Sequence, residues 1–212
     1  MSDEQRTEQW IQDRLGCVTA SRLSDVLAIV KSGYSASRKN YMAELICERL
    51  TGVPYPHFTS KEMEWGIEQE PFARSAYEAT TGVLVQEVGF IRHPDISDTG
   101  ASPDGLVGDN GGLEIKCPTT ATHIETMRSG KADSKYYPQM QWAMECCDRD
   151  WWDFASFDPR LPEGLQLFVV RVHRDEVFLK EARAEVVKFL AELEQAVDEL
   201  RKIGARNLEP VT

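Results

Sequence analysis

The chain has 212 residues, of which 42% are apolar and 28% are charged, and its formal net charge is −11. This composition is typical of a soluble globular protein, and the length suits one domain with its own core, which we expect over residues 1–212. The negative charge argues against a broadly basic nucleic-acid-binding surface, because contacts with phosphate need lysine and arginine. It does not exclude a small basic site, or a site that uses metal ions as its positive charge.

The sequence has no segment that predicts export or a membrane partner. No apolar run approaches the roughly 18–20 residues that span a bilayer, and the first ten residues, MSDEQRTEQW, are polar and acidic, unlike a signal peptide. The five cysteines form no C-x-x-C pair, so we expect reduced thiols and no zinc or iron–sulfur site. These features predict a cytoplasmic protein.

Apolar periodicity predicts helices in the first part of the chain. We expect them over 3–15, 21–30, 41–50 and 61–80, with a polar, basic loop at 31–40. Thr19 or Ser21 is the expected N-cap of the second helix, and Gly52 and Gly82 are expected to end the third and the fourth. Pro71 lies inside the fourth helix and predicts a kink or a break there.

The second part of the chain mixes strands and helices. We expect strands over 83–91, 106–107, 113–116, 151–158 and 165–173, and helices over 120–129 and 134–147. A long amphipathic helix is expected from about residue 174 onward. This order predicts a mixed α/β or α+β domain built around one sheet.

The most informative stretch is SPDGLVGDNGGLEIK, residues 102–116. The letters DNGG predict a turn, so the residues on either side of it should pair as a hairpin. Alternate strand residues share a face, so Glu114 and Lys116 should lie together while Leu113 and Ile115 enter the core. Asp104 can then come alongside Glu114. Two carboxylates held so close repel each other unless a cation lies between them, which predicts a divalent metal.

The residue types of this motif predict phosphodiester hydrolysis. Oxygen ligands favour Mg²⁺ or Mn²⁺ over zinc, and Lys116 beside the metal can activate a water and stabilise negative charge at phosphorus. Two alternatives stay open at this point. A surface hairpin can carry these residues by chance, and a calcium loop would need the EF-hand spacing, which fails from Asp98 and from Asp104.

Pro103-Asp104, nine residues and then Glu114-Ile115-Lys116 resemble the PD-(D/E)xK signature of the restriction-endonuclease-like nucleases. The surrounding letters narrow this resemblance. ASPDGL and GLEIKCP, RLGCVTAS at 14–21, WGIEQEPFAR at 65–74 and YYPQMQWAM at 136–144 resemble motifs of the lambda exonuclease family, the phage alkaline exonucleases. WWDFASFDPR and the closing helix align as well, so the resemblance covers nearly the whole chain.

The resemblance implies a fold and an activity. The fold is a restriction-endonuclease-like core, a mixed sheet flanked by helices. The activity is a 5′-to-3′ exonuclease that degrades one strand of linear duplex DNA to mononucleotides and leaves a 3′ single strand for recombination. The resemblance further implies two Mg²⁺ ions per active site, replaceable by Mn²⁺, a ring-shaped homotrimer threaded by DNA, and a single-strand annealing protein as partner. Its members are encoded by phages or prophages and act in the bacterial host.

Position by position, the resemblance also implies site residues. The implied catalytic residues are Asp104, Glu114, Lys116, Glu70 and Gln139, and the implied metal contacts are Asp104, Glu114, Glu70 and the carbonyl of Ile115. Contacts with DNA and its 5′-phosphate are implied for Arg14, Ser21, Lys31, Ser102 and Gln141, with Arg38 as a less direct contributor. Glu64 and Glu68 compete with Glu70, because Pro71 leaves open which of the three faces the metals.

Local sequence offers a physical reason for a phosphate site at Arg14. This arginine precedes a glycine turn and the start of the next helix, whose free N–H groups and dipole favour an anion. The alternative is that Arg14 closes the first helix as a favourable cation and that Ser21 is only a cap. Two other functions also remain open: a nuclease of the same fold that cuts internally, and a non-catalytic module whose acids bind metal for structure alone.

Overall fold

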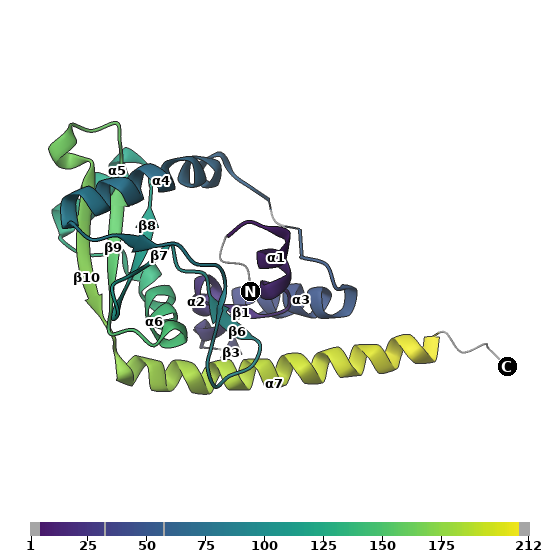
Figure 1. Ribbon diagram of the computed structural model, residues 1–212. Helices are drawn as coiled ribbons and strands as arrows, with labels where there is room; N and C mark the ends of the chain where they lie inside the picture. The colour runs from purple at the N-terminus through teal and green to yellow at the C-terminus, as the bar shows by residue number, and fades with distance from the viewer. Residues whose placement is uncertain (1–4, 32, 57, 208–212) are drawn as a thin grey trace.

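The structure is a computed structural model that describes residues 5–31, 33–56 and 58–207 (Figure 1). Its α-helices are α1 (Glu8–Arg14), α2 (Leu23–Leu27), α3 (Ala36–Thr51), α4 (Lys61–Thr81), α5 (Thr120–Ser129), α6 (Tyr137–Cys147) and α7 (Glu176–Asn207), and its 3-10 helices are η1 (Ala20–Arg22), η2 (Ser134–Tyr136) and η3 (Glu163–Leu165). Its strands are β1 (Val18–Thr19), β2 (Ile29–Val30), β3 (Gly33–Tyr34), β4 (Val85–Gln86), β5 (Ile91–Arg92), β6 (Thr99–Ala101), β7 (Gly105–Val107), β8 (Gly111–Lys116), β9 (Trp151–Phe157) and β10 (Leu167–His173).

The main sheet has five strands in the order β10-β9-β8-β7-β4. Strand β8 lies in the middle, antiparallel to β7 and parallel to β9, with α5 and α6 in the crossover that parallel pairing requires. A three-stranded sheet, β1-β6-β5, and the β2-β3 hairpin complete the strands. The expected mixed sheet and the expected β7-β8 hairpin are therefore confirmed.

Helices cover both faces of the main sheet, with α4 on one side and α6 on the other, while α7 runs beneath the domain and packs on α2, α3 and α6 (Figure 1). Residues of α4, Ala73 and Tyr77, pack on Leu113 and Ile115 of β8. The residues of β8 that alternate with Leu113 and Ile115 point to the other face, where α6 and α7 enclose the rest of the core. Strand β8 therefore presents a polar stripe, including Glu114, toward α6, as the alternation of the sequence predicts.

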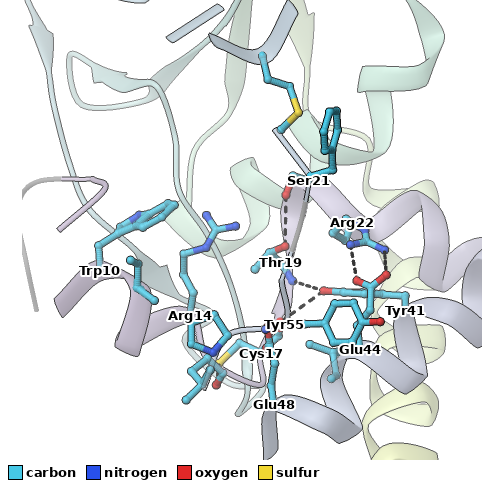
Figure 2. A pocket seen from close by; sticks show the side chains of 16 residues that line it. Trp10, Arg14, Cys17, Thr19, Ser21, Arg22, Tyr41, Glu44, Glu48 and Tyr55 are labelled. Atoms are coloured by element: carbon cyan, nitrogen blue, oxygen red, sulfur yellow. Dashed lines mark hydrogen bonds and ion pairs between the residues drawn. The ribbon is translucent and has the colours of Figure 1, made fainter. Parts of the chain in front are cut away.

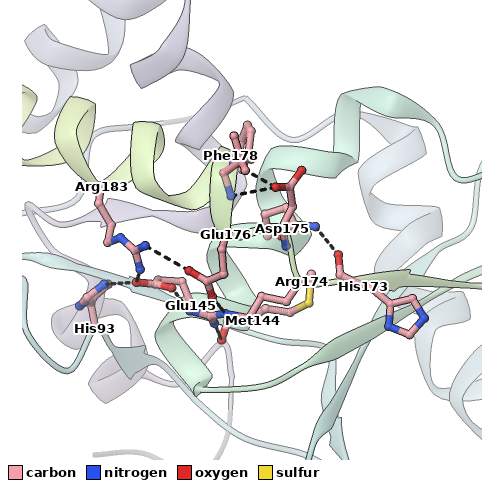
Figure 3. Close-up of polar contacts among 11 residues, drawn as sticks. His93, Met144, Glu145, His173, Arg174, Asp175, Glu176, Phe178 and Arg183 are labelled. Carbon is pink, nitrogen blue, oxygen red and sulfur yellow. Dashed lines mark hydrogen bonds and ion pairs between the residues drawn. The ribbon is translucent and has the colours of Figure 1, made fainter.

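Helix α7 is anchored to α6 through a buried carboxylate (Figure 3). Glu145 forms ion pairs with Arg174 and with Arg183, the latter at 2.7 Å, and the Nε2 atom of His93 lies 3.4 Å from the same carboxylate. Burial lowers the pKa of His93 although Glu145 acts in the opposite direction. The Nδ1 atom of His93 accepts two backbone N–H groups at 3.0 Å each, so the imidazole is neutral in the folded protein.

The N-terminal helices are shorter than the sequence predicts. The first begins at Glu8, where the Thr7 side chain accepts the N–H of Trp10 at 3.2 Å. The expected helix over 21–30 is a 3-10 turn and five helical residues, after which the backbone extends into β2, whose Ile29 and Val30 are β-branched. Ser35 caps α3, so the expected loop at 31–40 is a hairpin followed by a helix start.

A break at Pro71 is not observed, because α4 runs from Lys61 to Thr81 without interruption. Packing of Ala73 and Tyr77 on the sheet outweighs the one backbone hydrogen bond that proline removes. Gly82 ends this helix in the left-handed conformation, as predicted. The expected strand over 83–91 consists of β4 and β5, which belong to different sheets. Among the described helices, none combines the length and the apolarity needed to cross a bilayer.

Candidate active site

Glu114 and Lys116 stand two residues apart on β8 and contact each other directly. The carboxylate of Glu114, whose residue is 1% exposed, forms an ion pair with the Nζ atom of Lys116. The Nε2 atom of Gln139, from α6, donates to the same carboxylate oxygen at 2.6 Å. The helix that covers this face of the sheet therefore fixes the direction of Glu114, and the structure brings Gln139 together with Glu114 and Lys116.

Asp104, the residue that precedes β7, contacts the same strand. Its Oδ2 atom accepts the backbone N–H of Ile115 at 2.6 Å. Because the N–H and C=O groups of a strand residue point to the same side, the carbonyl oxygen of Ile115 also faces Asp104. Burial raises the pKa of Asp104 to about 7, and the negative charges of Glu114 and Glu70 act in the same direction, against Lys116.

The Lys116 ammonium is charged in this site. Burial alone would lower its pKa, but Glu114 and Asp104 outweigh burial and raise the pKa above its ordinary value. The Nζ atom also lies 5.0 Å from the centre of the Tyr136 ring, within the range of a cation–π contact. Lys116 is therefore a fixed hydrogen-bond donor that carries a positive charge, and in this protonated state it cannot act as a base.

Of the three candidate glutamates of α4, Glu70 is the one that faces this site. It lines a cavity of about 470 Å³ with Asp104, Ile115 and Lys116, whereas Glu64 and Glu68 are exposed and lie outside that cavity. The two carboxylate oxygens of Glu70 have separate partners. Arg6 pairs with Oε2 at 2.6 Å and Arg74 pairs with Oε1 at 2.9 Å.

The donor set fits a divalent cation, although the described residues contain no group of three acidic, histidine or cysteine side chains that could hold a metal as they stand. Asp104 keeps a raised pKa because it is buried near two further carboxylates, and a divalent cation would relieve that excess of negative charge. The ligands are oxygens, which suits Mg²⁺ or Mn²⁺. Lys116 and Gln139 contact one oxygen of Glu114, and the two oxygens of Glu70 are paired with arginines in this structure.

A second cavity, of about 190 Å³, is shared by the residues expected to bind phosphate and by residues of this site. It is lined by Arg14, Ser21 and Ser102, and also by Glu114 and Gln139. The Oγ atom of Ser102 accepts hydrogen bonds from Arg14 and from Trp10, both at 3.0 Å. Burial lowers the pKa of Arg14. Among the described residues Arg14 has no carboxylate within ion-pair distance, so its charge is available to an anion.

The backbone that leads to Ser21 is fixed by contacts with α3. Gly16 turns the chain with φ +67°, and its N–H donates to Glu48 at 2.8 Å. A larger cavity of about 540 Å³ shares Arg14 and Ser21 with the cavity of about 190 Å³ (Figure 2). The predicted caps are wrong, because the side-chain oxygens of Thr19 and Ser21 lie 3.2 Å from each other and cap no helix. A 3-10 turn and a five-residue helix follow, too short for the expected dipole argument.

Three residues expected to contact DNA line neither of the two site cavities, of about 190 Å³ and about 470 Å³. Gln141 is fully buried and binds the carbonyl of His173 and the N–H of Asp175, both at 2.8 Å, so it joins α6 to the start of α7. Arg38 is 1% exposed and binds Glu192 of α7 at 2.8 Å, so its role is structural. Lys31 is exposed next to the β2-β3 hairpin and lines neither site cavity.

Residues of the N-terminal segment reach the site although no motif in the sequence predicts it. Gln5 and Arg6 precede α1, and the Gln5 amide donates to the carbonyl of Pro103, beside Asp104, at 2.6 Å. Trp10 contacts Ser102, and Tyr136 faces Lys116. A polar segment before a helix carries no local signal for such contacts, since they depend on partners about a hundred residues away.

Comparison with known proteins identifies the family. The model of the YqaJ-like viral recombinase domain matches residues 9–150, more than half of the chain. LHK-Exo, an alkaline exonuclease from Laribacter hongkongensis, is 51% identical over 94% of this chain and 99% of its own, with a TM-score of 0.87. Its complex with dAMP has the same identity and coverage and a TM-score of 0.88.

A more distant structure, a phage-related exonuclease from Haemophilus somnus 129PT, is 17% identical over 87% of this chain and 96% of its own, with a TM-score of 0.63, and shows the shared fold alone. No curated protein matches the sequence closely enough to count as a relative. The family model and the identity with LHK-Exo confirm the resemblance to the phage alkaline exonucleases, and the chain belongs to the YqaJ-like viral recombinase family.

Proposed function

We propose that this protein is a Mg²⁺-dependent exonuclease that removes mononucleotides from the 5′ end of one strand of linear duplex DNA. The adjacency of two cavities carries the proposal. One is lined by the cation of Arg14 and by two serine hydroxyls, and it reaches Glu114. The other holds Asp104 and Lys116. The name of LHK-Exo as an exonuclease, and the mononucleotide in its complex, support the same activity.

The residues of the chain divide the work. Asp104, Glu114, Glu70 and the carbonyl of Ile115 would hold Mg²⁺, with Mn²⁺ as a substitute, and the number of carboxylates suits two ions. A bound divalent cation supplies a Lewis acid that lowers the pKa of a coordinated water and neutralises phosphate charge. The Lys116 ammonium orients the attacking water by donating to it, and it stabilises the charge that develops at phosphorus. Gln139 keeps the Glu114 carboxylate aimed into the site.

Arg14, Ser21 and Ser102 would bind the 5′-phosphate of the strand that is degraded. A guanidinium can make two parallel hydrogen bonds to a phosphate, and the two hydroxyls add further donors. Binding of the terminal phosphate here would place the next phosphate of the strand toward the Glu114 end of the cavity, which explains the release of single nucleotides.

We further propose that the protein acts as a ring-shaped homotrimer in the cytoplasm of a bacterial host, with a single-strand annealing protein as partner. A ring that encloses duplex DNA needs a basic lining only along its channel. A net charge of −11 is compatible with this arrangement and disfavours unspecific binding of DNA to the outer surface.

Digestion of end-labelled duplex DNA in Mg²⁺ tests the proposal. Linear duplex with a 5′-phosphate should lose its 5′ label as mononucleotide, and a circular duplex should stay intact. Asp104→Ala and Glu114→Ala should abolish digestion, whereas Asp109→Ala, in the exposed turn beside β8, should not. A rate above about a tenth of wild type in either active-site variant, which is about 1.4 kcal/mol in barrier, would contradict the assignment. Cutting of the circle would indicate an endonuclease, and no cutting of any substrate would indicate a binding module.

A further inference from the structure

Arg6 occupies the boundary between the two cavities of the site. Among the described residues it is the one side chain that lines both, with Arg14 and Ser102 on one side and with Asp104 and Lys116 on the other. Its side chain is 48% exposed, so it can reach a ligand without displacing the core. Any nucleotide that spans the two cavities must pass this guanidinium.

The backbone holds Arg6 at this place in an unfavourable conformation. Its φ of 65° lies in the left-handed region that non-glycine residues avoid. The neighbours on both sides maintain it: Gln5 donates to the carbonyls of Val88 and Pro103, at 3.2 Å and 2.6 Å, and Thr7 caps α1. A strained residue that its surroundings hold in place beside an active site is a candidate for a functional role.

The contact that Arg6 makes in this structure can be exchanged for another. Arg6 pairs with one oxygen of Glu70, and Arg74 pairs with the other oxygen from the same helix. If Arg6 turns away, Glu70 keeps a cationic partner. Glu70 faces the same cavity as Asp104, so binding of a divalent cation there would weaken the hold of Glu70 on Arg6 and free the guanidinium for a phosphate.

We propose that Arg6 binds the sugar-phosphate backbone of the terminal nucleotide between the two cavities, and that it thereby sets the length of strand drawn in before each cleavage to one nucleotide. This inference rests on the proposed exonuclease function. Arg14 and the serines hold the terminal phosphate at one end, and Arg6 holds the backbone at the point where the strand enters the metal-binding cavity. A planar guanidinium suits this position because it can contact a phosphate and Glu70 in turn with the same fork.

The test compares three replacements of Arg6 with one control. Arg6→Gln removes the charge, Arg6→Lys keeps it, and Arg6→Gly removes the side chain while relaxing the left-handed backbone, so that strain cannot explain a shared effect. Arg128→Gln removes a charge of the same kind from the exposed end of α5 and serves as the control. The substrate is a 5′-phosphorylated linear duplex labelled near the 5′ end, and the measurements are KM, kcat and the length of the first product.

Arg6→Gln and Arg6→Gly should both raise KM about tenfold or more, the usual loss for one charge-assisted hydrogen bond. They should also release dinucleotides and longer products in place of mononucleotides alone. Arg6→Lys should recover part of the affinity, because it keeps the charge but not the fork. A tenfold higher Mg²⁺ concentration should not restore the two variants, because Glu70 still has its other partner and the metal ligands are unchanged.

Wild-type KM and product length in Arg6→Gln would overturn the role of Arg6 while leaving the proposed function intact. Full rescue by Mg²⁺ would likewise overturn it, since Arg6 would then act only on the metal site. If the distribution of product lengths is as broad for Arg6→Lys as for Arg6→Gly, the strand does not depend on a positive charge at this position. If the wild-type protein itself releases no mononucleotides, the proposed function fails, and this inference fails with it.

Discussion

Replacing Asp104 by asparagine should stabilise the metal-free protein, by an amount that grows with pH. The pKa of Asp104 is about 7 in the folded protein against an ordinary value of 3.8, a difference of 7 − 3.8, or about 3 units. The folded state therefore holds the proton more tightly than the unfolded state, and stability falls as the pH rises from about 4 to about 7. Asparagine cannot ionise, and its side-chain oxygen can still accept the N–H of Ile115.

The size of the effect follows from the free energy of one pKa unit, about 1.4 kcal/mol. At pH 5 only the part of this pKa interval between 3.8 and 5 contributes, so the asparagine variant should be more stable than the wild-type protein by about 1.5 kcal/mol. Above pH 7 the whole interval counts, and the advantage should reach about 4 kcal/mol and then level off.

Denaturant unfolding in EDTA at pH 5, 6, 7 and 8 measures this advantage directly. Asp109→Asn, which makes the same replacement in the exposed turn outside both cavities, is the matched control. Addition of Mg²⁺ at pH 8 should reduce this advantage, because the wild-type protein binds the ion in its folded state and the variant lacks a ligand. An advantage of equal size at pH 5 and pH 8, or a variant less stable at both, would refute the reasoning.

The remaining predictions concern the lysine, the phosphate site, the two glutamines of α6 and the assembly. Lys116→Ala should lose digestion but keep Mg²⁺ binding by calorimetry, and Lys116→Arg should not restore digestion, because a guanidinium fork cannot replace a compact ammonium; a large loss of Mg²⁺ affinity would make Lys116 a structural partner. Arg14→Ala should slow digestion of 5′-phosphorylated ends far more than that of 5′-hydroxyl ends, and equal slowing would leave Arg14 without a role in reading the end. Gln141→Ala should lower the free energy of unfolding by about 1–3 kcal/mol, since it leaves two buried backbone groups without partners, whereas Gln139→Ala should reduce activity with a smaller loss of stability. Light scattering at micromolar concentration should show a trimer, and a monomer with full processive activity would contradict the ring.

Strand β8, which carries Glu114 and Lys116, could be predicted because its signals are local. The letters DNGG predict the hairpin, although the turn itself is Gly108-Asp109-Asn110 and the two following glycines already belong to β8. The alternation from Leu113 to Lys116 predicts the face that each side chain takes. Helix ends marked by Gly52 and Gly82 were predictable for the same reason, since glycine adopts the left-handed conformation without strain.

The errors concern residues whose partners lie far along the chain. Arg38 looks like a surface cation in a basic stretch, but Glu192 of α7 makes it a buried structural residue. Gln141 follows Gln139 by two positions on one helix, so the two amides must point to different sides, and only the placement of His173 shows which side is the active site. Arg6 belongs to the same class, because its importance depends on how two cavities meet.

The two halves of the site sit on parts of the fold that should differ in their resistance to opening. Strand β8 is the central strand of the main sheet and is covered on both faces, so it can open only when the domain unfolds as a whole. Helix α1, which carries Arg14, has seven residues, and its side chains are only partly buried or exposed, so it can open by itself at lower cost. On heating, we therefore expect discrimination between phosphorylated and unphosphorylated ends to fade several degrees before hydrolysis stops, which would leave a warm enzyme that still cleaves DNA but no longer selects its ends.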